Sequence, residues 1–150
     1  MKSTSQKLRQ FALLLCGFVT LVTPIELLLV NHVQKPTQLI PFALLAINIA
    51  FVVAMFFRPE TGTLRAYRWF GLVMLFGALT GVGFHLNGNL EIAREINPNL
   101  SGVALILEGL RGGNPVLAPG LFVQIAALGL MFTFRHPNLE QTVYAREAVV

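Results

Sequence analysis

The sequence has little charge and lacks several residues that common active sites need. It has no aspartate, a single cysteine (Cys16), and only 12% charged residues in 150. Without aspartate a Ser-His-Asp triad is excluded, and one cysteine excludes both a disulfide framework and a cysteine-based metal site. The chain also has neither an HExxH motif nor a glycine-rich phosphate loop. We therefore expect a protein that is not an enzyme and has no metal site.

The formal net charge is +4, but the positions of the basic residues do not fit a nucleic-acid-binding protein. They gather at the ends of apolar stretches and form no stripe with interleaved aromatic residues. We expect no nucleic-acid partner.

Long apolar stretches are what the sequence does have. Hydrophobic residues make up 55% of the chain and concentrate at about residues 11–31, 37–57, 69–86 and 117–134. A helix rises ~1.5 Å per residue, so about 20 residues cross a hydrocarbon core of ~30 Å. We predict an all-α, polytopic membrane protein in which one domain forms a bundle of four transmembrane helices.

The segment at residues 87–115 is too long for a simple connection between two spans. Ser101 is placed to cap a helix that runs to Arg111 and ends at Gly112. That helix is apolar almost all round yet too short to cross a bilayer. We therefore expect an outer, interfacial helical loop.

The basic residues predict the orientation of the spans. With both termini inside, eight basic residues lie on the inner side and three on the outer side, which accounts for all 11. This excess fits the rule that cytoplasmic segments carry more Lys and Arg. We predict cytoplasmic termini, a cytoplasmic tail at residues 135–150, and a bacterial inner or thylakoid-like membrane.

Three of the four stretches carry small residues on one helical face. Small residues let the backbones of neighbouring membrane helices approach closely. The predicted packing residues are Ala46, Ala50, Ala54, Gly71, Gly77, Ala78 and Gly81, and the first stretch adds Ala12, Cys16, Thr20 and Thr23.

Glu26 is the one ionisable residue in the first stretch, two residues after Pro24. A carboxylate inside a membrane span is by default a functional hypothesis. One interpretation is a polar pocket with Gln124, in which Glu26 carries a proton or binds a cation. The other is a structural hydrogen bond beside Pro24, and the sequence does not decide between them. For Gln124 and Asn48 we favour interhelical hydrogen bonds.

Two histidines are candidate ligands for a cofactor. His85, with His32, has the chemistry of an axial ligand to haem or chlorin. Single histidines near membrane interfaces are common, so we favour a structural role for both.

These features together favour a non-enzymatic accessory or scaffolding subunit of a larger membrane complex. Its partners would be membrane lipid and other integral membrane subunits or a second copy of the chain. One alternative is a small oligomeric proton- or cation-coupled carrier that uses Glu26. Another is a haem- or chlorin-binding redox or photosynthetic subunit that uses His85.

Overall fold

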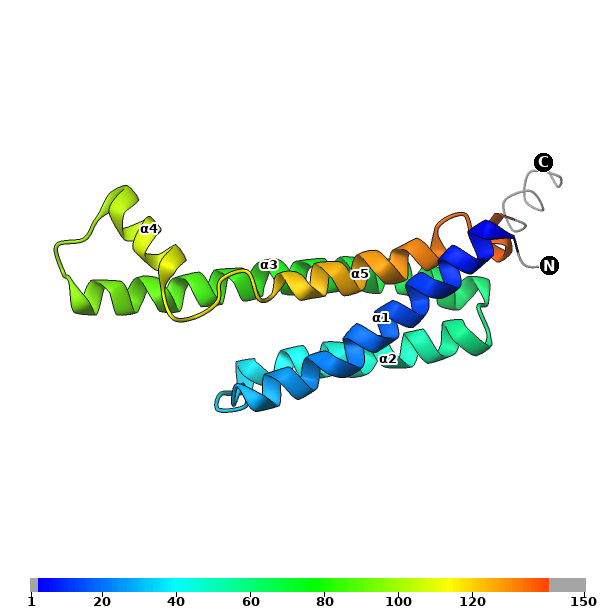
Figure 1. Cartoon of the computed structure of the whole chain (residues 1–150), viewed down its shortest axis with the longest axis horizontal. Coiled ribbons are helices and arrows are strands. Elements are labelled where there is room, and N and C mark those ends of the chain that lie inside the picture. Colours follow the sequence, from blue (N-terminus) through cyan, green and yellow to red (C-terminus); the bar gives the residue numbers. More distant parts are fainter. Residues whose placement is uncertain (1–2, 141–150) are drawn as a thin grey trace. The chain divides into compact units, whose positions relative to one another are not determined.

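The computed structural model describes residues 3–140, and every regular element among them is a helix (Figure 1). The elements are α1 (Thr4–Leu29), a short 3-10 helix η1 (Pro36–Leu39), α2 (Ile40–Phe57), α3 (Thr61–Ile96), α4 (Gly102–Arg111) and α5 (Gly120–Thr133). The all-α prediction is confirmed. Of the predicted tail at residues 135–150, residues 141–150 lie outside the described residues, as do Met1 and Lys2.

Three helices are long and apolar enough to cross a membrane: α1, η1 together with α2, and α3. They are compatible with an integral membrane protein. The fourth predicted span corresponds to α5, which is apolar but has only 14 residues. At ~1.5 Å per residue it measures about 21 Å, less than the ~30 Å of a hydrocarbon core.

The ends of α1 follow from local sequence. Ser3 and Gln6 form a capping box, in which Gln6 N donates to Ser3 Oγ at 3.3 Å and Ser3 N donates to Gln6 Oε1 at 3.0 Å. At the other end Asn31 adopts a left-handed φ of 56°, and His32 N donates to Leu27 O at 2.8 Å. This is a Schellman-type ending, and asparagine is one of the few residues that tolerate that φ.

Helix α3 is longer at both ends than the predicted span at residues 69–86. It begins at Thr61. Leu64 and Tyr67 are buried, so the packed face of the helix extends into this first part, close to Pro59. It ends at Ile96, just before Asn97-Pro98, since a residue that precedes proline is disfavoured in a helix. The first part of the predicted loop at residues 87–115 is therefore helical.

The described residues divide into two compact units. The first holds residues 3–74 and 124–140, and the second holds residues 75–123. In the first unit α1 and α2 run antiparallel and lie side by side (Figure 1). In the second unit α4 packs on the last part of α3, where Gly109 lies against Leu86 and Leu90. The prediction of a single domain stays a prediction.

Each helix of the first unit buries one face. Helix α2, for example, buries Leu45, Asn48, Val52 and Met55. Their spacing of three and four residues is that of one helical stripe. The opposite side of α2 carries Ala46 and is exposed. The polar Asn48 thus lies inside the unit among apolar side chains, where it needs hydrogen-bond partners.

Candidate functional site

Four polar side chains meet in the core of the first unit. They are Asn48 of α2, Tyr67 of α3, and Cys16 and Thr20 of α1. The exposed fraction is 0% for Asn48, Tyr67 and Cys16 and 2% for Thr20. We call this set the Asn48 cluster.

The amide of Asn48 joins three helices. Its Nδ2 donates to Thr20 Oγ1 at 2.8 Å, and its Oδ1 accepts from Tyr67 OH at 3.2 Å. Thr20 Oγ1 in turn donates to the carbonyl oxygen of Cys16 at 2.7 Å. These contacts confirm the predicted interhelical hydrogen bonds of Asn48. Both ends of the amide are used, so its burial leaves no large desolvation cost.

Helix α5 closes the same cluster from a fourth side. Cys16 Sγ donates to the carbonyl oxygen of Ile125 at 3.4 Å. Further along α5, a side chain at Gly129 would overlap the hydroxyl of Tyr67. The absence of a side chain at Gly129 is thus what lets Tyr67 reach Asn48. The cluster is neutral and internally hydrogen-bonded, an arrangement that positions four helices against one another.

Sequence reasoning identified only part of this cluster. The polarity of Asn48 within an apolar stretch was a sufficient signal, and Cys16 and Thr20 were recognised as one stripe. Tyr67 was missed because the third helix was expected to begin near Trp69, which placed Tyr67 in a turn.

The two residues predicted to handle a proton or cation are both exposed on the first unit. Glu26 lies in the last turn of α1, which continues through Pro24, and Gln124 lies on α5. Within residues 3–140 neither side chain makes a hydrogen bond, and so the structure does not show the interhelical bond expected for Gln124. The proposed role of Glu26 and Gln124 in ion or proton binding stays a prediction.

The two candidate cofactor ligands belong to different units. His32 is half-buried in the turn after α1 in the first unit, and His85 is half-buried on α3 in the second. Their roles as ligands stay predictions. Over residues 3–140, no three His, Cys, Asp or Glu side chains come together as a possible metal site.

The small-residue faces differ in whether their own chain covers them. On α1 the stripe at Ala12, Cys16, Thr20 and Thr23 is buried. On α3, a Cβ at Gly71 would lie 3.2 Å from Leu130 of α5, and one at Gly81 would lie 2.8 Å from Pro119. Ala78 of α3 is buried too, and Gly77 is half-buried.

The small-residue face of α2 differs from those of α1 and α3 because most of it is exposed. Ala46 and Ala50 are exposed, and Ala54 is half-buried. Ala43 extends this exposed face by almost one turn toward the start of the helix. Among the described small-residue faces, this is the one that the helices of its own unit leave uncovered.

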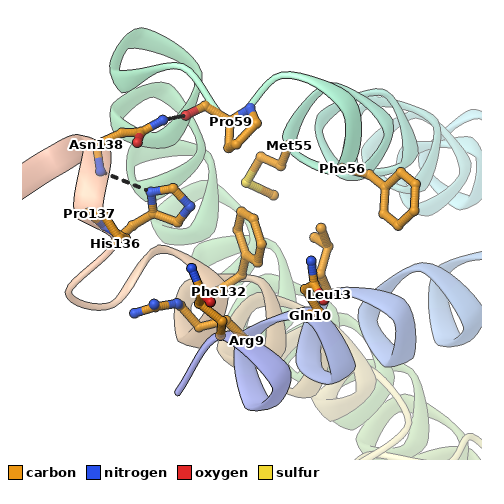
Figure 2. A pocket seen from close by; sticks show the side chains of 11 residues that line it. Arg9, Gln10, Leu13, Met55, Phe56, Pro59, Phe132, His136, Pro137 and Asn138 are labelled. Atoms are coloured by element: carbon orange, nitrogen blue, oxygen red, sulfur yellow. Dashed lines mark hydrogen bonds between the residues drawn. The ribbon is translucent and has the colours of Figure 1, made fainter. Parts of the chain in front are cut away.

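A pocket of about 290 Å³ lies in the first unit near the amino terminus of α1 (Figure 2). It is lined by Gln6, Arg9, Gln10, Leu13, Met55, Phe56, Pro59, Phe132, His136, Pro137 and Asn138. In Figure 2 His136, Asn138 and Arg9 lie on one side and Leu13 and Phe56 on the other, with Phe132 between them. We call this the Arg9 pocket.

Hydrogen bonds to backbone carbonyls hold the walls of the Arg9 pocket. Arg9 Nη1 donates to Arg135 O at 2.9 Å, and Arg135 has a left-handed φ of 44°. Asn138 Nδ2 donates to Pro59 O at 2.7 Å, and Thr61 Oγ1 donates to Asn138 O at 2.9 Å. The chain after α5 is thereby attached both to α1 and to the turn between α2 and α3.

His136 is the titratable group of this pocket, and 9% of it is exposed. Its Nδ1 accepts a hydrogen bond from Asn138 N at 3.3 Å. Burial lowers the pKa of His136, and the positive charge of Arg9 lowers it further. The neutral imidazole is therefore favoured.

The second unit has its own buried amide, Asn89 of α3. Asn89 Nδ2 donates to the carbonyl oxygens of Gly109 and Asn114, each at 2.8 Å, and Asn114 N donates to Asn89 Oδ1 at 2.9 Å. A side chain at Gly112 would overlap Asn89. Residues 111–115 thus pass directly over the side chain of Asn89. The hydrogen bonds of Asn89 hold this segment and the end of α4 in place.

Comparisons of the chain with protein-family models, with curated proteins and with solved structures found no match.

Proposed function

We propose that this protein is a non-enzymatic accessory subunit of a larger membrane complex and packs against a different integral membrane protein through α2. One observation carries the proposal. The small-residue faces of α1 and α3 are covered by the chain itself, whereas Ala46 and Ala50 of α2 are exposed.

The exposed face of α2 suits another helix in a bilayer. Lipid chains are as apolar as leucine, so membrane helices associate through close van der Waals packing and through hydrogen bonds. Alanines at Ala43, Ala46 and Ala50 allow such close approach. The exposed side chains of Ile47 and Val53 flank them. A bundle that needed only its own four helices would have no use for a second packing face on α2.

The proposal includes four spans with both termini inside. Before α5 begins, Ala118 N donates to Pro115 O at 3.0 Å, and Gly120 N donates to Leu117 O at 2.9 Å. Bonded backbone ahead of the helix supports a longer fourth span, because a bilayer leaves no water for free backbone groups. The excess of basic residues on the inner side supports a bacterial inner or thylakoid-like membrane with cytoplasmic termini.

The test compares two substitutions at exposed alanines. The wild type, Ala50→Leu and the control Ala127→Leu on α5 are expressed in the native host and purified in mild detergent. We expect one integral membrane protein to co-purify in fixed stoichiometry with the wild type and the control. Ala50→Leu should lose this partner by roughly tenfold, which corresponds to a weakening of about 1.4 kcal/mol. Unchanged melting of purified Ala50→Leu would show that the variant still folds.

Three results would contradict the proposal. The wild type could elute as a monomer, or Ala50→Leu could retain the partner as well as Ala127→Leu does. A homodimer that Ala50→Leu disrupts would assign the face to a second copy and remove the accessory role.

The two other predicted functions have separate tests. A carrier requires ion or proton flux in proteoliposomes that Glu26→Gln abolishes, since glutamine imitates only the protonated carboxyl. A haem or chlorin protein requires a visible absorption band that His85→Ala removes. We expect neither flux nor band. Flux that depends on Glu26, or a band that depends on His85, would replace the accessory role.

A further inference from the structure

We infer that the Arg9 pocket binds the phosphate headgroup of an anionic phospholipid. The inference rests on the membrane insertion contained in the proposed function, but it does not depend on any protein partner. The lipid would come from the leaflet at the amino-terminal end of α1.

The first step is that the lining of the Arg9 pocket carries a positive charge and no negative one. Arg9 is the one fully charged residue among the eleven that line the pocket, and none of them is a carboxylate. The nearest carboxylates along the chain, Glu60 and Glu140, are exposed and lie outside the lining. Lys7, Arg58 and Arg135 flank the lining residues in the sequence. An anion entering the pocket therefore meets a positive field.

The second step is the set of donors that Arg9 offers. Its Nη1 is used by two backbone carbonyls, those of Arg135 at 2.9 Å and Phe134 at 3.5 Å. Within the described chain, Nε and Nη2 have no acceptor. Bonding through one nitrogen fixes the guanidinium plane and leaves the other donors for a ligand. A planar fork of donors is the geometry by which arginine binds phosphate oxygens.

The third step concerns His136. Because its Nδ1 accepts from Asn138 N at 3.3 Å, the proton of the neutral ring is assigned to Nε2. The ring lines the pocket, so Nε2–H is a second donor there. A neutral donor beside a fixed cation suits an anion that carries both charged and ester oxygens.

The fourth step distinguishes a lipid from a small soluble anion. The pocket also has apolar lining, formed by Leu13 and Phe56 on the other side and by Phe132 in the middle, with Gln10 beside Leu13 (Figure 2). Phe56 is 53% exposed, and its neighbour Phe57 is 74% exposed. The pocket therefore lies beside an exposed apolar surface that acyl chains can cover. Basic pockets between helices on the cytoplasmic side are sites where anionic headgroups bind.

The size of the pocket defines which part of the lipid it holds. About 290 Å³ is at the lower end of small-ligand pockets, which begin at about 300 Å³. It has room for a phosphate and the first methylene groups. The rest of the acyl chains would remain in the bilayer beside the exposed apolar side chains of α1 and α2.

The experiment measures lipid retention by native mass spectrometry. Protein in detergent is titrated with phosphatidylglycerol or with phosphatidylcholine, which shares the phosphate but is neutral overall. We expect roughly tenfold stronger retention of phosphatidylglycerol by the wild type, a ratio that corresponds to 1.4 kcal/mol. Arg9→Gln should bring the two lipids close to parity. Arg65→Gln, at an exposed arginine outside the lining, should behave as wild type.

A second variant and a competition measurement complete the test. Arg9→Lys retains a cation that still reaches a carbonyl but loses the planar fork, so it should fold, retain both lipids less well, and keep part of the preference for phosphatidylglycerol. Inorganic phosphate should not displace bound phosphatidylglycerol, because it lacks the apolar part.

Three results would overturn the inference. The wild type could retain both lipids equally, or Arg9→Gln and Arg65→Gln could lose the preference for phosphatidylglycerol equally. Full displacement of the lipid by phosphate would indicate a free-anion site. Failure of the wild type to enter phospholipid nanodiscs at all would instead contradict membrane insertion, and with it the proposed function.

Discussion

Each of the two units holds one buried asparagine, and the two amides are used differently. Asn48 in the first unit bonds to side chains, namely Thr20 Oγ1 and Tyr67 OH. Asn89 in the second unit bonds to backbone groups of Gly109 and Asn114. Both amides donate and accept, so neither is left with a costly unpaired group.

The kind of hydrogen-bond partner determines how much of its unit each asparagine stabilises. Side-chain partners on other helices make the position of Asn48 depend on several residue identities, and they couple α1, α2, α3 and α5. Backbone partners make Asn89 depend on close approach, which glycine permits. We therefore expect damage at the Asn48 cluster to spread through the first unit, and damage at Asn89 to remain with α4 and the turn after it.

The strongest way to break the Asn48 cluster is Gly129→Ala. The new methyl group would overlap the hydroxyl of Tyr67, and overpacking of this kind costs about 3 kcal/mol of unfolding free energy. The control is Gly120→Ala in the same helix, where a Cβ meets nothing within 4 Å. Denaturant titration in detergent should show a large loss for Gly129→Ala and none for Gly120→Ala. Equal stability of the two variants would mean that Tyr67 does not lie against Gly129.

A more selective change is Asn48→Leu, which keeps the branching at Cγ, enlarges the side chain slightly and removes all three hydrogen bonds of the amide, including the one from Nδ2 to Cys16 Sγ at 3.6 Å. Tyr67 OH then lacks its acceptor, and we expect a loss of about 2 kcal/mol. Asn87→Leu is the comparison, since that asparagine is exposed and, within residues 3–140, its side chain bonds to Glu91 alone. Thermal melting in detergent measures both. A wild-type melting temperature for Asn48→Leu would show that packing alone holds the cluster.

The Asn89 side of the comparison is tested by a pair of neighbouring glycines. A Cβ at Gly112 would overlap Asn89, whereas one at Gly113 meets nothing within 4 Å. Gly112→Ala should speed proteolysis within residues 97–115 by roughly tenfold, as a local opening free energy falls by about 1.4 kcal/mol. Gly113→Ala should be cleaved as slowly as wild type. Faster cleavage throughout the chain in Gly112→Ala would contradict a local role.

The smallest expected effect is on the pH dependence of stability, and it comes from His136 in the Arg9 pocket of the first unit. Burial, and then the charge of Arg9, lower the pKa of His136 below its ordinary value of about 6.5. Folding therefore favours the neutral ring, and its contribution is complete above pH ~6.5 and is lost as the pH falls below it. Melting temperature should decrease modestly between pH 7.5 and 5.5. His136→Phe should remove that part of the slope, and an unchanged slope would sink this assignment.

The sequence predicted the helices better than it predicted their contacts. Apolar stretches of about 20 residues indicated the long helices, but the sequence did not predict which side of α2 is buried. The start of α3 could not be predicted, because the polar segment at residues 58–68 contains Pro59 and Gly62, which are poor helix formers, and the helix there is stabilised by tertiary contacts. One of these is Arg68 Nη2 donating to Thr133 O at 2.8 Å.

The Asn89 contacts were missed for a related reason. Asn89 meets groups 20 and 25 residues further along the chain, and no local pattern specifies such a pairing. Gly112 was visible in the sequence as the end of a helix, but a helix ending does not reveal which amide the following turn covers. For the same reason the members of the Arg9 pocket, drawn from α1, α2 and the chain after α5, were not recognised as a group.

The most direct test of the difference between the two asparagines is hydrogen exchange followed by mass spectrometry in Asn48→Leu and Asn89→Leu. We predict faster exchange in Asn48→Leu throughout α1, α2, residues 61–74 and residues 124–133. In Asn89→Leu we predict faster exchange only within residues 97–115, with the first unit as protected as in wild type. Faster exchange in Asn48→Leu confined to a few residues around position 48, or faster exchange throughout the first unit in Asn89→Leu, would contradict the difference between the two asparagines.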